Sequence, residues 1–207
     1  NNEFIDTYWN GSSNGILIVP SGPISTIQND NNFINLSSDI YINGGTASNI
    51  SIQGNNESIR RKPNSGISRS IHILNNISSA VNIKNFTIFG NDLGIRLEGE
   101  FKNLKVENNE LTVEGPSARF IDINNVNSSG NTSSISNNNI LFDLTGSYAN
   151  TSLFKIKDCG YLSVINNVIH NNTGVIVSGQ STAFDVSGTD KSLFKENKVY
   201  WPGRGFT

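Results

Sequence analysis

Five charged or titratable residues share one position in short strand-like segments of this chain. Each stands between two apolar residues, as in Ile121-Asp122-Ile123 and Phe184-Asp185-Val186. Successive side chains of a β-strand point to opposite faces, so the middle residue points outward when its neighbours point into a core. The residues of this charged column are His72, Arg96, Asp122, Lys155 and Asp185.

Two carboxylates of the charged column, Asp122 and Asp185, are candidate catalytic acids. If their segments lie two strands apart in a parallel stack, the carboxyl groups are roughly 10 Å apart. Inverting glycosidases hold their two carboxyl groups about 6.5–9.5 Å apart, so this spacing is slightly too wide. A glycosidase-like pair is therefore a hypothesis that rests on spacing alone.

The remaining members of the charged column, His72, Arg96 and Lys155, are candidate glycan contacts. A second outward column follows two positions later in the same segments and consists of Glu98, Asn124, Lys157 and Ser187. The two columns together would form a polar groove for an acidic or neutral glycan. The alternative is a solvated face on which opposite charges of neighbouring strands pair with each other.

Aromatic rings are the other ingredient of sugar binding, because a flat ring can stack on the apolar face of a pyranose. Tyr148 lies in a predicted loop between Gly146 and Ser152, and Tyr161 lies at a predicted corner. Both are candidate glycan contacts. Packing against the protein is the alternative role, since aromatic side chains dominate cores and interfaces.

Composition argues against several other classes of function. The net charge is −2 and the isoelectric point is about 5.7, which gives no indication of binding to nucleic-acid phosphates. No apolar run reaches the roughly 18 residues of a membrane span. The single Cys159, two histidines and absence of methionine predict no disulfide framework, metal site or cofactor. The chain starts at Asn1 with no signal-like segment, which favours a processed or excised piece.

A repeated phrase indicates how these residues are positioned. Its copy Leu162–Ile169 reads apolar, variable, apolar, two variable positions, Asn, variable, apolar, and similar copies occur along the chain. The repeated asparagines are Asn55, Asn91, Asn109, Asn138, Asn167 and Asn197, so the last three intervals are 29, 29 and 30 residues. A recurrence of this length is typical of a solenoid.

The spacing of apolar residues predicts a parallel β-solenoid with three short strands per turn and about six to seven turns. Asparagine tolerates the left-handed backbone of a sharp corner, and stacked asparagines can form a hydrogen-bonded ladder. We expect an N-terminal cap over 1–15, the solenoid over 16–199, and a C-terminal cap or continuation over 200–207.

The N-terminal segments Ile16–Gly22, Ile40–Gly44 and Asn49–Asn55 resemble the first turns of pectin-lyase-like right-handed parallel β-helices. That superfamily includes pectate lyases, polygalacturonases and phage tailspike depolymerases, and the chain most resembles a tailspike-like member. The resemblance implies an all-β, single-stranded right-handed parallel β-helix. The paired aspartates and the Gly-His-Gly segment of the hydrolases are absent, as is the acidic calcium cluster of the lyases, so no catalytic position carries over.

Three functions follow as hypotheses. The first is a virion tailspike-like or tail-fibre-like protein that binds host-surface polysaccharide, with depolymerase activity as a further possibility. The resemblance then implies a homotrimer on a virion surface or in the extracellular space, without nucleic-acid partners or membrane insertion. The second is a secreted polysaccharide lyase or glycoside hydrolase. The third is a structural or adhesive β-helix without catalysis.

Overall fold

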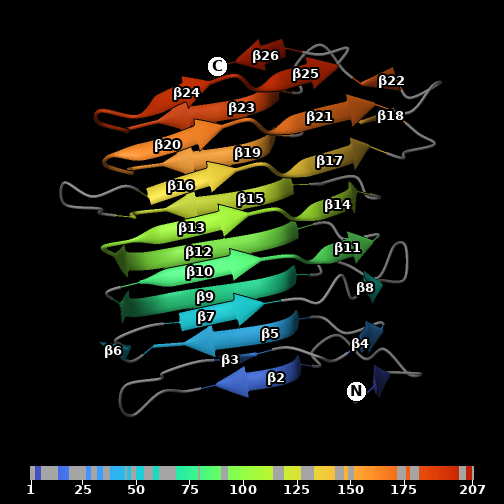
Figure 1. Cartoon of the computed structure of the whole chain (residues 1–207), viewed down its shortest axis with the longest axis vertical. Helices are drawn as coiled ribbons and strands as arrows, with labels where there is room; N and C mark the ends of the chain where they lie inside the picture. The colour runs from blue at the N-terminus through green and yellow to red at the C-terminus, as the bar shows by residue number, and fades with distance from the viewer. Residues whose placement is uncertain are drawn as a thin grey trace.

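The chain folds into a parallel β-solenoid. The computed structural model describes residues 3–5, 14–18, 27–28, 32–34, 38–44, 46–47, 50–53, 58–60, 69–78, 80–89, 93–113, 119–126, 133–142, 147–148, 152–171, 176–177, 182–200 and 204–206. Within these residues every regular element is a β-strand. The strands stack from the N-terminal end at the bottom of Figure 1 to the C-terminal end at the top.

Three long sheets form the walls of the solenoid. Sheet A contains β1 (Glu3–Ile5), β4 (Asn32–Ile34), β8 (Ser58–Arg60), β11 (Thr87–Phe89), β14 (Glu110–Val113), β17 (Asn139–Phe142), β21 (Val168–Asn171) and β25 (Lys198–Tyr200). Sheet B contains β2 (Asn14–Ile18), β5 (Ser38–Asn43), β9 (Arg69–Ser78), β12 (Leu93–Phe101), β15 (Arg119–Asn124), β19 (Ser152–Lys157), β23 (Thr182–Ser187) and β26 (Arg204–Phe206), and β6 (Thr46–Ala47) pairs beside β9. Sheet C contains β3 (Ile27–Gln28), β7 (Ile50–Gln53), β10 (Val81–Lys84), β13 (Leu104–Glu107), β16 (Ser133–Ser136), β20 (Leu162–Ile165) and β24 (Leu193–Lys195).

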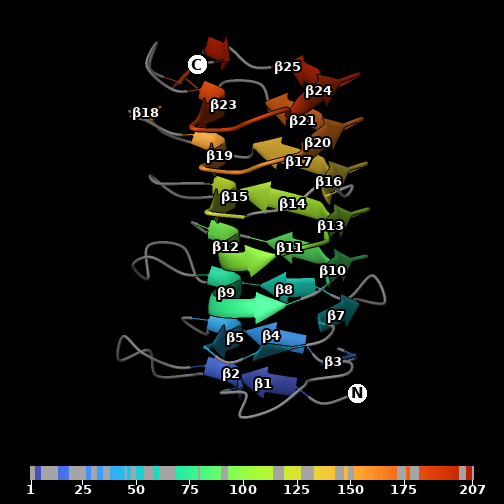
Figure 2. The same cartoon turned by 90° about the vertical axis from the view of Figure 1, so that its left-hand side faces the viewer.

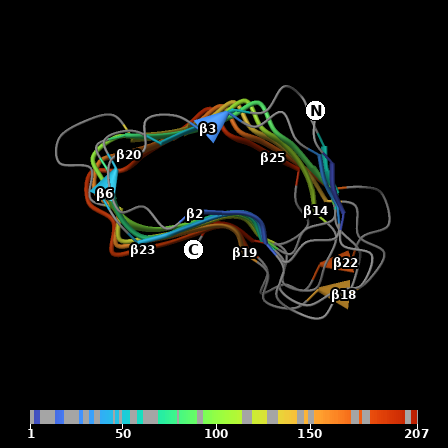
Figure 3. The same ribbon diagram turned by 90° about the horizontal axis from the view of Figure 1, so that it is seen from below.

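The chain visits the sheets in the repeating order A, B, C, and within each sheet neighbouring strands pair in parallel. A further small sheet pairs β18 (Ser147–Tyr148) with β22 (Ile176–Val177). Sheets B and C form opposite walls in Figure 2. Figure 3 views the solenoid from its N-terminal end. The chain runs clockwise from sheet A (labelled β14) through sheet B (β2) to sheet C (β3) while it recedes from the viewer, which is a right-handed winding.

Over the described residues the solenoid completes seven turns, each with one strand from sheets A, B and C, and β25 and β26 follow the seventh turn. The short strand β6 is an additional member of sheet B and adds no turn. The first two strands of sheet A, β1 and β4, are three residues each and carry no copy of the asparagine phrase. β1 lies inside the predicted cap 1–15, and β26 lies inside 200–207. The capping roles of both segments stay predictions.

Like residues stack above one another inside the solenoid. One such interior column on sheet B consists of Ile40, Ile71, Ile95, Ile121, Phe154 and Phe184, all buried. The rings of Phe154 and Phe184 lie 4.7 Å apart, and Phe120 packs against Phe154 at 5.1 Å. A single turn has no second layer on which to bury these side chains, so the core forms only when turns stack.

Consecutive asparagines at one corner divide the two roles that the sequence assigned to a single residue. The first of each pair, Asn108, Asn137 or Asn166, has a positive φ of 57–58°. The second is buried and forms the ladder: the side chain of Asn109 donates to Asn138 Oδ1 at 3.0 Å, and that of Asn138 donates to Asn167 Oδ1 at 2.8 Å. A polar group buried in this way needs such partners, since an unpaired buried amide is costly.

Over the described residues the asparagine ladder begins at Asn109. Strand register aligns Ile83 with Val106, and the Phe86 N–H donates to Asn109 Oδ1 at 3.1 Å. Phe86 therefore occupies the ladder position for which the phrase predicts Asn91, because the repeat unit of this turn begins at Val81 and not at Phe86. Asn91 and Asn55 lie outside the described residues. At the other end the ladder continues to Asn197, whose Oδ1 accepts from Asn167.

Candidate functional site

The charged column is present on the outer face of sheet B in the predicted register. His72 pairs with Arg96, Arg96 with Asp122, Asp122 with Lys155, and Lys155 with Asp185. Each member is flanked by apolar residues that fill the interior, all buried except the partly buried Val186 beside Asp185, and this turns the polar side chain toward the outer face. The second column, Glu98, Asn124, Lys157 and Ser187, is likewise in register.

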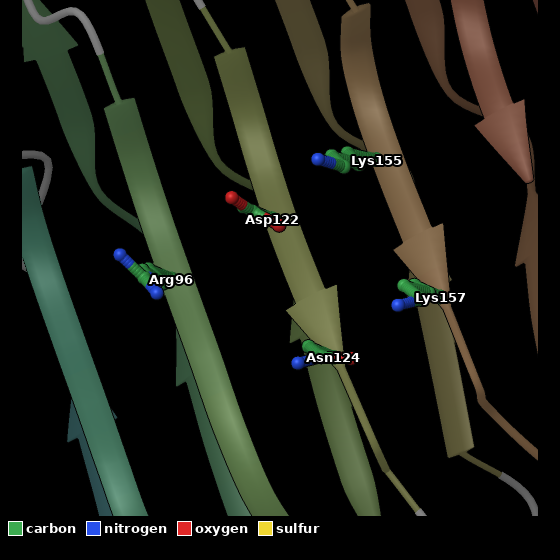
Figure 4. Close-up of a pocket in the computed structure, with 5 residues that line it drawn as sticks. All are labelled: Arg96, Asp122, Asn124, Lys155 and Lys157. Atoms are coloured by element: carbon green, nitrogen blue, oxygen red, sulfur yellow. The ribbon is translucent and has the colours of Figure 1, made fainter.

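A shallow polar pocket lies where the two columns meet. It has a volume of about 210 Å³ and is lined by Arg96, Asp122, Asn124, Lys155 and Lys157. Figure 4 shows these side chains projecting from three adjacent strands, β12, β15 and β19, toward the same side. Three cations and one carboxylate face the pocket, so its lining is positive although the whole chain carries a net charge of −2.

The ion pairs beside the pocket run along the strands and not across them. Arg96 Nη2 lies 3.2 Å from Glu98 Oε2, and Arg119 Nη1 lies 2.9 Å from Asp122 Oδ2. Among the described residues no ion pair joins Arg96 to Asp122, or Lys155 to either aspartate of the column. The predicted cross-strand pairing was wrong here, because each arginine has a carboxylate two or three residues away in its own strand.

Lys155 is the cation that this arrangement leaves available. Its side chain is half-buried, and no carboxylate within the described part of the chain lies close enough to form an ion pair with it. Arg96 and Lys157, by contrast, each have an acidic neighbour, with Lys157 Nζ 3.7 Å from Asp158 Oδ2. An incoming anion could therefore pair with Lys155 without breaking an existing salt bridge.

The register places the two candidate catalytic carboxylates two strands apart, with Lys155 on the strand between them. Each carboxylate has its own partner: Arg119 binds Asp122, while Asp185 Oδ2 accepts from Ser152 Oγ at 3.3 Å. A catalytic role for the two aspartates stays a prediction.

The other predicted contacts differ in how far they can reach a ligand. His72 is only 5% exposed and stacks on Tyr41, with ring centroids 4.9 Å apart, so protein atoms cover most of its surface. Tyr161 is 38% exposed at the corner that follows β19. Tyr148 belongs to β18, but its side chain lies outside the described residues.

Two residues of the candidate site do not follow from the pattern of the charged column. Arg119 binds Asp122, and the signal in the sequence is a basic residue three positions before an outward acid. Lys157 belongs to the second column and also lines the pocket.

Cys159 shows no sign of a nucleophilic role. Its thiol is buried and donates to the Lys157 carbonyl at 3.1 Å, and burial is the main cause that raises its pKa to about 11. At neutral pH the group is therefore a protonated thiol. Across the described residues no group of three or more His, Cys, Asp and Glu side chains could hold a metal ion. The same part of the chain contains no helix long and apolar enough to cross a membrane.

Comparison with family models, with curated proteins and with solved structures finds no match for this chain.

Proposed function

We propose that the outer face of sheet B binds an acidic polysaccharide, and that the protein is the glycan-binding β-helix of a tailspike-like virion protein. The observation that carries the binding proposal is the positive pocket around Lys155, a cation without an ion-pair partner among the described residues. The virion surface as location, and a homotrimeric assembly, rest on the resemblance of the chain to tailspike β-helices.

The chemistry of the pocket favours a sugar polymer that bears carboxylates. Lys155 and Lys157 present ammonium groups on one strand. Asn124 adds an amide that can donate hydrogen bonds to sugar hydroxyls and accept hydrogen bonds from them. Lys155 and Lys157 stand two residues apart on one face of β19, so a linear polymer that follows this strand meets both ammonium groups. A nucleic acid is a poorer fit, because the pocket includes Asp122 and the overall charge is negative.

Binding is tested by titrating the protein with polygalacturonate, with neutral dextran as the matched polymer. We expect polygalacturonate to bind more weakly as salt rises, because exposed charges are screened, and dextran to bind little. Lys155→Gln should weaken binding to polygalacturonate about tenfold, since a charge-assisted hydrogen bond to a carboxylate contributes about 1.5 kcal/mol.

The control is Lys105→Gln, which removes an exposed lysine from sheet C on the opposite wall. It should leave the affinity nearly unchanged. Equal effects of the two substitutions, or no binding of either polymer, would contradict the proposal and favour a structural β-helix.

Depolymerase activity is the second part of the hypothesis and has its own readout. Release of reducing ends, or of unsaturated products that absorb in the ultraviolet, would reveal a hydrolase or a lyase. If such activity is present and survives both Asp122→Asn and Asp185→Asn, these aspartates are not its acids. A monomer in sedimentation equilibrium would count against the tailspike assembly and favour a secreted enzyme or a solitary binding module.

A further inference from the structure

A pair of exposed side chains lies at the corner between sheets B and C, next to the pocket. Tyr161 and Lys191 occupy equivalent places in neighbouring turns. The preceding residues, Gly160 and Asp190, form a parallel β-bridge, and the Tyr161 N–H donates to the Asp190 carbonyl at 3.0 Å. Both residues have a positive φ of 52°. Bulky residues seldom adopt this conformation, which glycine and asparagine adopt much more readily.

The corner itself explains the backbone conformation but not the choice of side chains. At the corner between sheets C and A, positive φ falls on four asparagines and on one residue of another type, namely Asn85, Asn108, Asn137, Asn166 and Glu196. Strained residues of other types persist where surrounding structure holds them and often mark functional sites. Tyr161 and Lys191 are two such residues at equivalent places of consecutive turns.

The two side chains form one polar and aromatic surface. Lys191 Nζ donates to Tyr161 Oη at 2.9 Å and lies 5.0 Å from the centroid of the tyrosine ring. The ammonium thus sits beside the hydroxyl end of the ring, which leaves ring surface exposed to solvent. The hydrogen bond to Tyr161 is the first cause that raises the pKa of Lys191, and the charge of Asp190 adds to it, so the lysine is an ammonium at neutral pH. An ammonium has three donors, and Tyr161 uses one of them.

This surface adjoins the pocket on sheet B. Lys157 lines the pocket and ends β19, and the chain then turns through Asp158 and Gly160 to Tyr161. A polymer held at Lys155 and Lys157 would leave sheet B past this corner if it followed the direction of the strands. The corner is therefore the next place where protein groups could hold it.

We propose that Tyr161 and Lys191 form a second contact site for a carboxylated sugar ring. The apolar face of the pyranose stacks on the tyrosine ring, and the ammonium of Lys191 pairs with the carboxylate. The inference rests on the proposed binding of an acidic polysaccharide and extends it around the corner from sheet B toward sheet C. It selects uronic acids over neutral sugars, because a neutral ring would make only the stacking contact.

The site is tested with a monosaccharide probe that does not depend on the polymer. D-galacturonate should shift the ring resonances of Tyr161 in NMR spectra in a saturable manner, and D-galactose should shift them much less. Tyr161 is assigned by comparison with Tyr161→Asn, which suits the backbone because asparagine tolerates positive φ. Lys191→Asn should abolish the preference for galacturonate over galactose. Shifts that are absent, or equal for the two sugars, would overturn the proposal.

Polymer binding separates this inference from the proposed function. Tyr161→Asn and Lys191→Asn should each weaken polygalacturonate binding about three- to fivefold, as expected for an exposed contact. Glu196→Asn, which changes another residue with positive φ, should have no such effect. If Lys155→Gln weakens binding and both corner variants bind like the parent chain, the corner site is wrong while the proposed function stands. If galacturonate shifts Tyr161 but Lys155→Gln has no effect, the corner site stands and the pocket does not.

Discussion

At the residue scale, the corners of this solenoid show why asparagines occur in pairs. The first residue must adopt positive φ, and the second must form buried hydrogen bonds within the turn and to the next turn. Asparagine meets both needs, since its short amide stabilises a left-handed backbone locally and also provides a donor and an acceptor for the ladder. Glu196 departs from this pattern, because it has a φ of 58° and stands where four earlier turns have asparagine.

Glu196→Asn should stabilise the protein. The substitution replaces a residue that is strained at positive φ by one that tolerates it, and the expected gain is about 1 kcal/mol. The change removes the ion pair in which Lys195 Nζ lies 2.9 Å from Glu196 Oε1, but both side chains are more than half exposed, so that pair contributes little. Urea denaturation with equal slopes for the two proteins would measure the difference. A lower midpoint for Glu196→Asn would show that the ion pair matters more than the backbone.

At the scale of elements, the asparagine ladder links sheet C to sheet A at each turn. Asn138 donates to the Val106 carbonyl at 3.1 Å and to Asn167 Oδ1, and its own Oδ1 accepts from both the backbone and the side chain of Asn109 at 3.0 Å. These bonds hold the end of one strand in a fixed position relative to the turns on either side. The ladder therefore fixes the alignment of neighbouring turns at the corner between sheets C and A.

Asn138→Ala should destabilise the solenoid by about 2–4 kcal/mol. The substitution leaves buried donors of Asn109 without their acceptor, and each unpaired buried group costs about 1–3 kcal/mol. The neighbouring Asn139→Ala is the matched control, because Asn139 is exposed and outside the ladder. Its effect should stay within about 0.5 kcal/mol, as for most surface changes. Similar losses from the two substitutions in thermal or urea unfolding would mean that the ladder adds no specific stability.

At the scale of the whole molecule, each strand of the three long sheets pairs with strands of the turns directly before and after it in the described part of the chain. The strand order of every sheet follows the order of the turns, so the stability of the solenoid is approximately a sum over turns and the interfaces between them. The ladder intervals show that one turn near the middle of the chain has 29 residues. A turn of this kind can be removed without changing the contacts within the others.

Deletion of residues 110–138 should give a shorter solenoid that still folds. The deletion removes β14, β15 and β16, joins Asn109 to Asn139, and lets Asn109 bond to Asn167 in place of Asn138. Far-UV circular dichroism and a cooperative unfolding curve would show the retained β structure.

Deletion of 110–139, one residue longer, brings Ile140 into the outward position, because side chains alternate along a strand. That protein should be clearly less stable. Equal stability of the two deletions would contradict the importance of register.

The sequence by itself determined the solenoid architecture and the charged column, because both depend on local periodicity. Alternation along a strand placed Asp122 and Lys155 outward, and the repeat placed them on neighbouring strands, as the register shows. The strand β1 and the position of Phe86 in the ladder did not follow from the asparagine phrase, because a copy that lacks asparagine cannot be aligned by that phrase.

Only the tertiary structure decided which groups are available for binding. Ion pairs depend on side-chain rotamers and on distances within a few ångströms, which register alone does not specify. Three such contacts are visible only in the tertiary structure. Arg119 binds Asp122, Tyr41 stacks on His72, and Lys155 has no ion-pair partner in the described part of the chain. The contact between Tyr161 and Lys191 likewise required the stacked corner, since 30 residues separate the two in sequence.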